Sequence, residues 1–97
     1  MTIVLKLYVT GTTSRAIEAR RKTSEIVEHF LSDCELEVID ILERPDLAER
    51  DRIIATPTIV RVSPAPIRKV IGDISDPHTL LNGLGLVGGE GFREGAS

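Results

Sequence analysis

The 97-residue sequence contains one cysteine, no tryptophan and only 3% aromatic residues. A lone cysteine, Cys34, excludes a disulfide within the chain, a Cys-rich metal site and a CxxC redox pair. The few aromatic rings and a net charge of −3 leave neither a stacking platform nor a basic footprint for nucleic acid. We therefore expect no nucleic-acid partner.

The sequence also lacks a long hydrophobic run. No segment approaches the roughly 20 apolar residues of a membrane-spanning helix, and residues 1–9 carry neither the positive region nor the cleavage site of a signal peptide. We expect no membrane partner and a cytoplasmic location. The length fits one domain, and 41% hydrophobic with 28% charged residues is typical of a globular chain.

Apolar periodicity predicts alternating strands and helices. A β-branched run at the start of the chain is typical of a buried central strand, and Ser14 can cap the amphipathic helix that follows. Pro45 and Pro77 each stand where a helix begins. The expected elements are strands over 3–9, 36–41, 58–62 and 67–71, and helices over 15–31, 46–51 and from Pro77 onward.

This order, β-α-β-α-β-β-α, predicts an α/β thioredoxin-like fold with a parallel half and an antiparallel hairpin. The Thr56-Pro57 step supports it, because proteins of that fold resemble one another in a cis proline just before the third strand. We expect one domain over residues 1–87 and a flexible glycine-rich tail over 88–97.

The stretch where thioredoxin-like enzymes carry redox cysteines, residues 10–15, contains no thiol. Ser14 has no evident activating base, and the acidic neighbours of Cys34 oppose a thiolate. His29 and His78 do not stand at metal-ligand spacing. We expect no catalytic residue, cofactor or metal; the alternative is a thioredoxin-fold enzyme that uses Ser14 or Cys34 with glutathione.

Several short segments follow one another in a specific order: VLKLYV (4–9) with Gly11, VID (38–40) with Leu42, Pro45 with LAE (47–49), IATPT (54–58), and VIGD (70–73) with Ser75. Together they resemble the KaiB family of circadian clock proteins from Ile3 to about Val87. The resemblance implies a non-enzymatic partner of KaiC, a hexameric RecA-like ATPase. It also implies two folds: a resting form that associates as a homotetramer, and a thioredoxin-like monomer that binds the ATPase after slow refolding.

On this resemblance we expect partner contacts from the first helix, the second strand and the hairpin loop: Arg15, Lys22, Glu35, Glu37, Pro64, Pro66, Arg68 and Lys69. Fold switching requires two packings within a few kcal/mol of each other. Glycine and asparagine weaken the last predicted helix, so this region is where two packings would compete. The expected switch residues are Pro57, Gly72, Asp73, Asn82, Gly83 and Gly85.

The sequence departs from the cyanobacterial pattern at several places. Glu35 and Glu37 make the second strand more acidic, Gly85 stands where an acidic residue is frequent, and the glycine-rich tail replaces an acidic one. A KaiA-like third partner is therefore not assumed. A KaiB-like module that serves a different protein partner in stress signalling is the alternative.

Overall fold

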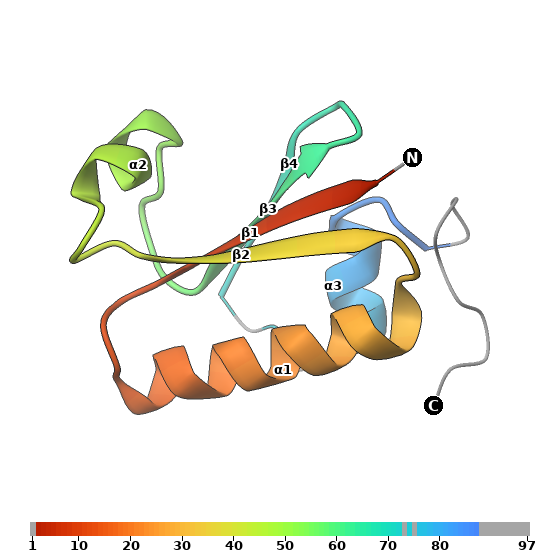
Figure 1. The fold of residues 1–97 in the computed structure, drawn as a ribbon, viewed down its shortest axis with the longest axis horizontal. Helices are drawn as coiled ribbons and strands as arrows, with labels where there is room; N and C mark the ends of the chain where they lie inside the picture. The colour runs from red at the N-terminus through yellow and green to blue at the C-terminus, as the bar shows by residue number, and fades with distance from the viewer. Residues whose placement is uncertain (1, 73, 75, 88–97) are drawn as a thin grey trace.

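The computed structural model describes residues 2–72, 74 and 76–87 (Figure 1). Its elements confirm the predicted order: β1 (Ile3–Val9), α1 (Ser14–Phe30), β2 (Cys34–Asp40), α2 (Pro45–Arg50), β3 (Thr58–Ser63), β4 (Arg68–Ile71) and α3 (Pro77–Gly83). The α/β thioredoxin-like class is the observed one. The tail expected over 88–97 and the expected switch residue Asp73 lie outside the described residues.

A four-stranded sheet in the order β2-β1-β3-β4 forms the centre of the molecule. β1 pairs with β2 in parallel and with β3 antiparallel, and β4 completes an antiparallel hairpin with β3. β1 is central because its residues bury side chains on both faces of the sheet, from Leu7 on one to Tyr8 on the other. β2 and β4 are the edge strands.

The two faces of the sheet are covered unequally (Figure 1). α1 and α3 lie on one face, where Leu5, Ile26 and Leu81 belong to the main hydrophobic core. α2 lies on the other face at one end of the sheet, and a smaller cluster around Tyr8 and Val60 packs there. No described helix covers the rest of this second, open face.

The cap of α1 differs from the prediction. Thr13, not Ser14, is the N-cap, and its Oγ1 accepts a hydrogen bond from the Ala16 amide at 3.2 Å. Thr13 has the extended backbone, φ −62° and ψ 161°, that an N-cap requires, whereas Ser14 already lies in the helix. The helix therefore spans 14–30 where the sequence predicted 15–31.

β2 begins at Cys34, earlier than the sequence predicted. The parallel ladder with β1 starts there, because Ile3 aligns with Cys34 and its amide donates to the Asp33 carbonyl at 2.8 Å. Strand pairing thus extends into a stretch with weak apolar alternation. At the hairpin the reverse occurs: β4 begins at Arg68, and Ile67, expected in the strand, precedes it with 64% of its surface exposed.

The glycines that weaken α3 in sequence terms have structural roles in this fold. Gly83 ends α3 against β4, where an added Cβ would lie 2.6 Å from the Val70 Cγ2 atom. Gly85 follows in the left-handed conformation, φ +70°, which glycine adopts without strain. Both residues therefore fit the thioredoxin-like packing and allow the chain to turn after α3.

Candidate functional site

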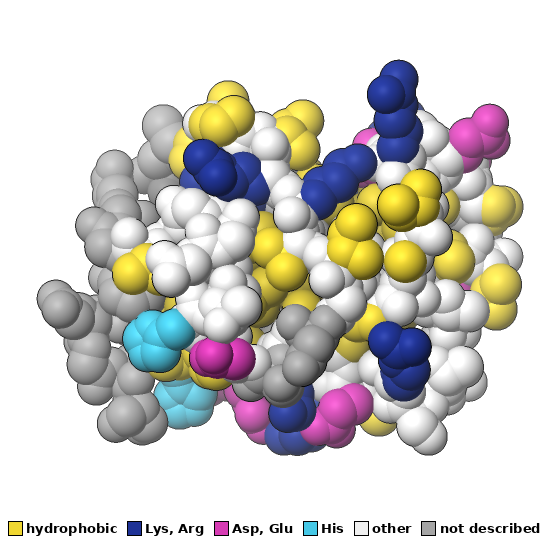
Figure 2. Space-filling model, turned by 180° about the vertical axis from the view of Figure 1, so that it is seen from behind, with side chains coloured by type: hydrophobic (Ala, Val, Ile, Leu, Met, Phe, Trp, Pro, Cys, Tyr) yellow, Lys and Arg dark blue, Asp and Glu magenta, His cyan; other side chains and the backbone are white. Residues whose placement is uncertain are grey.

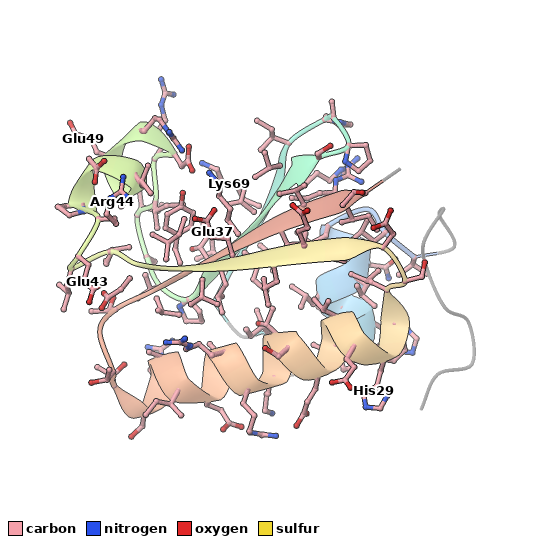
Figure 3. All side chains as sticks on the ribbon, in the orientation of Figure 1. His29, Glu37, Glu43, Arg44, Glu49 and Lys69 are labelled. Carbon is pink, nitrogen blue, oxygen red and sulfur yellow. The ribbon has the colours of Figure 1, made fainter. Side chains whose placement is uncertain are left out.

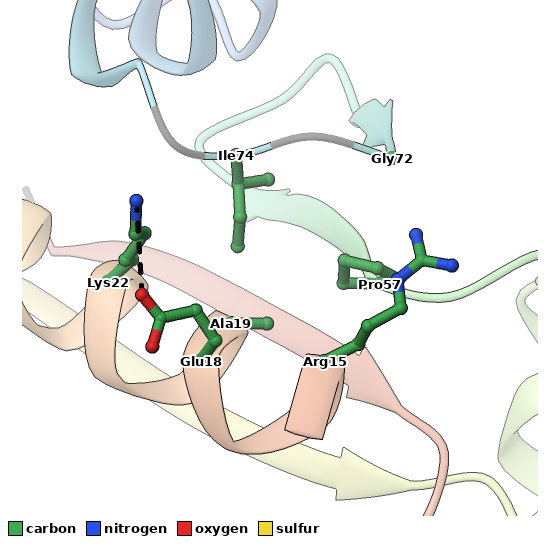
Figure 4. Close-up of a pocket in the computed structure, with 7 residues that line it drawn as sticks. All are labelled: Arg15, Glu18, Ala19, Lys22, Pro57, Gly72 and Ile74. Atoms are coloured by element: carbon green, nitrogen blue, oxygen red, sulfur yellow. Dashed lines mark ion pairs between the residues drawn. The ribbon is translucent and has the colours of Figure 1, made fainter. Parts of the chain in front are cut away.

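A pocket of about 260 Å³ brings together residues that the sequence assigned to two different roles. It is lined by Arg15, Glu18, Ala19, Lys22, Pro57, Gly72 and Ile74 (Figure 4). The helical period places Arg15, Glu18 and Lys22 on one side of α1. Pro57 precedes β3 and Gly72 follows β4, and the Gly72 amide donates to the Pro57 carbonyl at 2.9 Å. Two expected contact residues therefore border two expected switch residues.

The charges at this pocket are only partly neutralised. Lys22 Nζ lies 3.9 Å from a Glu18 carboxylate oxygen, the ion pair drawn in Figure 4. The stronger partner of Glu18 is Arg21, whose hydrogen bonds hold the pKa of that carboxyl below its usual value. Arg15 forms no ion pair with any residue that the structure describes. The pocket thus presents cationic groups that a partner's carboxylates can pair with.

Glu35 and Glu37 lie on the exposed edge strand β2. Among the described strands β2 pairs with β1 alone, so the backbone groups along its outer edge are free to pair with an added strand. In register Glu37 stands beside Lys6 of β1, and Figure 3 shows it on the α2 side of the sheet with Lys69. The edge therefore offers both backbone pairing and negative charge.

The hairpin residues do not form one basic patch. Arg68 lies near the turn after α3, where a Cβ on Gly85 would come within 3.1 Å of its Nε atom. Lys69 lies on the opposite face and donates a short hydrogen bond to the Asp51 carbonyl. Strand side chains alternate between faces, so neighbouring charges in the sequence are separated by the sheet. Arg68 and Lys69, which are adjacent in the sequence and were both expected as partner contacts, therefore lie on different surfaces.

Pro64 and Pro66 lie in the loop between β3 and β4, where a buried arginine holds the backbone. The Arg61 guanidinium, in a residue only 6% exposed, donates to the Pro66 carbonyl at 3.0 Å and to the Gly85 carbonyl at 3.5 Å. Arg61 therefore ties the expected contact loop to the turn after α3. This link was not predicted from the sequence, because an arginine inside an apolar strand does not indicate which carbonyl groups it will bind.

The sequence analysis also missed a polar cluster on the open face. Tyr8 is fully buried and its hydroxyl donates a short hydrogen bond to the Asp51 carboxylate at the end of α2. Lys6 Nζ lies 3.9 Å from the same carboxylate. A buried tyrosine hydroxyl needs a hydrogen-bond partner, so Tyr8 in an apolar strand was the available signal.

The thiol and hydroxyl candidates are poorly placed for catalysis. Burial, followed by the charges of Asp33 and Glu35, raises the pKa of the half-buried Cys34 thiol to about 11, which disfavours the nucleophilic thiolate. Ser14 is exposed on the first turn of α1. Within the described residues no three His, Cys, Asp or Glu side chains gather as a metal site.

None of the described helices combines the length and the apolar character needed to cross a bilayer. This agrees with the absence of a long hydrophobic run in the sequence.

Comparison with known proteins matches residues 6–86 to the KaiB domain family. The circadian clock oscillator protein KaiB of Acaryochloris marina is 49% identical over 87 residues, which cover 89% of this chain and 84% of the relative. The KaiB of Synechococcus elongatus strain PCC 7942 is 47% identical over 90 residues, covering 92% and 88%. The family match begins within β1 and extends past the end of α3.

Solved structures give the same fold at low sequence identity. The N-terminal domain of SasA from Synechococcus elongatus has a TM-score of 0.71 at 22% identity, covering 92% of this chain and 89% of that domain. Mitochondrial thioredoxin 3 from Saccharomyces cerevisiae has a TM-score of 0.69 at 19% identity, covering 86% and 76%. At this identity the likeness concerns the fold, and it confirms the thioredoxin-like prediction.

Proposed function

The chain belongs to the KaiB family of circadian clock proteins, and from this premise we propose that it is a non-enzymatic protein that binds a KaiC-type hexameric ATPase and regulates its cycle. The observation that carries the proposal is identity of 47–49% to KaiB clock proteins over most of both chains. The raised pKa of Cys34 supports the non-enzymatic part. The complex would form in the cytoplasm.

The proposed contacts come from three elements, and the hairpin presents its charges on both faces of the sheet. These elements are the α1 side with Arg15 and Lys22, the β2 edge with Glu35 and Glu37, and the hairpin with Pro64, Pro66, Arg68 and Lys69. Exposed charges support these contacts, because charges at an interface orient the partner and speed its association. The free edge of β2 supports them as well, because a partner strand can pair with it. At the α1 surface, Arg15 and Lys22 border a pocket of about 260 Å³.

We propose further that this fold exchanges slowly with a second fold, which rests as a homotetramer. The proposed switch residues are Pro57, Gly72, Asp73, Asn82, Gly83 and Gly85. Support comes from the last segment, whose glycines are well placed in this packing yet lower helix propensity. If a partner binds only one of the two folds, its apparent affinity falls in proportion to the fraction of chains in that fold.

Native mass spectrometry tests the proposal directly. The chain is measured alone and then over hours with the KaiC-type ATPase of the same organism, in ATP and in ADP. We expect a resting homotetramer, followed by slow appearance of rings that carry up to one copy per ATPase subunit. No complex in either nucleotide would refute the ATPase proposal and favour another partner, as in stress signalling.

Charge reversals locate the contact surface. Arg15→Glu with Lys22→Glu, Glu35→Lys with Glu37→Lys, and the single changes Arg68→Glu and Lys69→Glu are compared with Arg20→Glu, an exposed control on α1. A variant changed at the interface should lower association at least tenfold, while the control leaves it unchanged. Association as fast as that of the control in every one of these variants would reject every proposed contact surface.

Slow refolding is tested with a variant locked in the thioredoxin-like fold. A cross-link that joins α3 to β4 would prevent α3 from leaving the sheet, since Gly83 and Val70 are in direct contact there. The locked variant should bind the ATPase without the slow phase. An unchanged association time course would reject fold exchange as the delaying step while leaving ATPase binding itself intact.

A further inference from the structure

A second pocket lies on the open face of the sheet, away from α1. It measures about 390 Å³ and is lined by Lys6, Arg50, Asp51, Arg52, Val60, Val62, Ile67 and Lys69. This volume falls within the range of roughly 300 to 1,000 Å³ in which proteins hold small molecules. The end of α2, the sheet face and the start of β4 enclose it.

The floor of this pocket is apolar. Val60 belongs to the small core around Tyr8, and Val62 packs against it while remaining partly exposed. Ile67 leaves 64% of its surface in water. Figure 2, the view from behind, shows hydrophobic side chains next to Lys and Arg side chains at the surface of the molecule. Exposed aliphatic surface of this kind would gain from contact with an apolar ligand.

The rim of this pocket is cationic. Lys6, Arg50, Arg52 and Lys69 supply four positive charges against the one carboxylate of Asp51, a net charge of +3. That carboxylate is already engaged by the Tyr8 hydroxyl, by Arg50 at 3.4 Å and by Lys6 at 3.9 Å. The lining therefore keeps an excess of positive charge, which favours an anion.

Arg52 is a rim residue that no described side-chain interaction holds in place. It forms no side-chain hydrogen bond or ion pair within the described part of the chain. Its backbone is left-handed, φ 55°, a conformation that is strained for a long side chain and that glycine or asparagine would adopt more readily. Strained residues of this kind cluster at ligand sites.

We propose that this pocket binds a small organic phosphate, with the phosphate on the cationic rim at Arg52 and Lys69 and an apolar body on Val60, Val62 and Ile67. A phosphate monoester carries about −1.5 to −2 charges at neutral pH, which matches the excess positive charge of the lining. One guanidinium group can donate two parallel hydrogen bonds to the oxygens of a phosphate. This site is separate from the α1 pocket, and its only residue among the proposed ATPase contacts is Lys69.

Amide chemical shifts of the full chain, followed by NMR in 150 mM NaCl, test the site. The ligand probe is phenyl phosphate, compared with inorganic phosphate and with phenol. Phenyl phosphate should give saturable shifts at Val60, Val62 and Ile67, and bind at least tenfold more tightly than either component. Similar affinity for phenyl phosphate and inorganic phosphate would overturn the apolar part of the proposal and hence the ligand class.

Matched variants identify the rim. Arg52→Gln removes no side-chain hydrogen bond or ion pair within the described residues and should weaken phenyl phosphate binding at least fivefold, with Lys69→Gln adding to the loss. Arg15→Gln with Lys22→Gln, in the other pocket, should leave binding unchanged. Shifts that centre on residues 15–22 would overturn the assignment. So would tighter binding of an acidic hexapeptide than of phenyl phosphate, because a protein segment would then be the occupant.

Discussion

Replacing Gly83 by alanine should destabilise the thioredoxin-like fold, although alanine is the better helix former. The new Cβ would lie 2.6 Å from Val70 Cγ2, about 1 Å short of the ~3.5 to 4.0 Å at which carbon atoms attract. Overpacking of this kind costs about 1 to 3 kcal/mol, while the gain in helix propensity is at most about 1 kcal/mol. With the full gain subtracted the difference lies between about 0 and 2 kcal/mol, and we expect a net loss of about 1 kcal/mol.

Urea denaturation followed by circular dichroism measures this loss, and each kcal/mol should lower Tm by about 4 to 8 °C. Asn82→Ala is the matched control. It lies next to Gly83 on α3 and is exposed, so it should leave stability unchanged or raise it by a few tenths of a kcal/mol.

A double-mutant cycle isolates the contact between α3 and β4. Val70→Ala removes the methyl groups that the new Cβ would meet, so Gly83→Ala should cost less in that background, by about 1 kcal/mol or more. Additive effects, or a Gly83→Ala variant as stable as the parent chain, would show that α3 does not approach β4 as closely as described.

Further predictions concern the helix cap, the thiol and the open face. Thr13→Ala should lower stability by about 0.5 to 2 kcal/mol in urea denaturation and Ser14→Ala should not, since Thr13 alone caps α1; the opposite ranking would restore the serine cap. With its pKa raised to about 11 by burial and two carboxylates, Cys34 should react with iodoacetamide at a rate still rising above pH 10, and a plateau near pH 8.5 would contradict this. Burial raises the pKa of Asp51, but the Tyr8 hydrogen bond and neighbouring cations outweigh it and hold that pKa below its usual value. The resulting stabilisation is present above about pH 4 and lost as pH falls through the folded-state pKa, so Asp51→Asn should flatten the acid limb of the stability profile; an unchanged limb would exclude Asp51 as its source.

The order of elements could be predicted from the sequence because each carries a strong local signal. The apolar run of β1, the helical period of α1 and the prolines before α2 and α3 are properties of neighbouring residues. Element ends were less predictable. Cys34 is in β2 because its neighbour Ile3 pairs with it, a partner about thirty residues away that local patterns do not encode.

The contacts of the candidate sites were the least predictable part. Arg15 and Lys22 could be assigned to one helix side from their spacing, but only the folded chain brings Pro57 and Gly72 to the same pocket. The bond between Tyr8 and Asp51 joins β1 to the end of α2 across 43 positions. Such contacts depend on how the layers pack, which is a property of the whole chain.

The separation of Arg68 from Lys69 by the sheet has a consequence for any interaction with this hairpin. A ligand that touches both side chains must straddle the β4 edge, and a flat partner surface can reach one of them at a time. Two residues that are adjacent in the sequence thus belong to two independent surfaces, one beside the turn after α3 and one beside α2. A variant in which both residues are replaced cannot show which of the two surfaces a partner contacts, whereas single substitutions can.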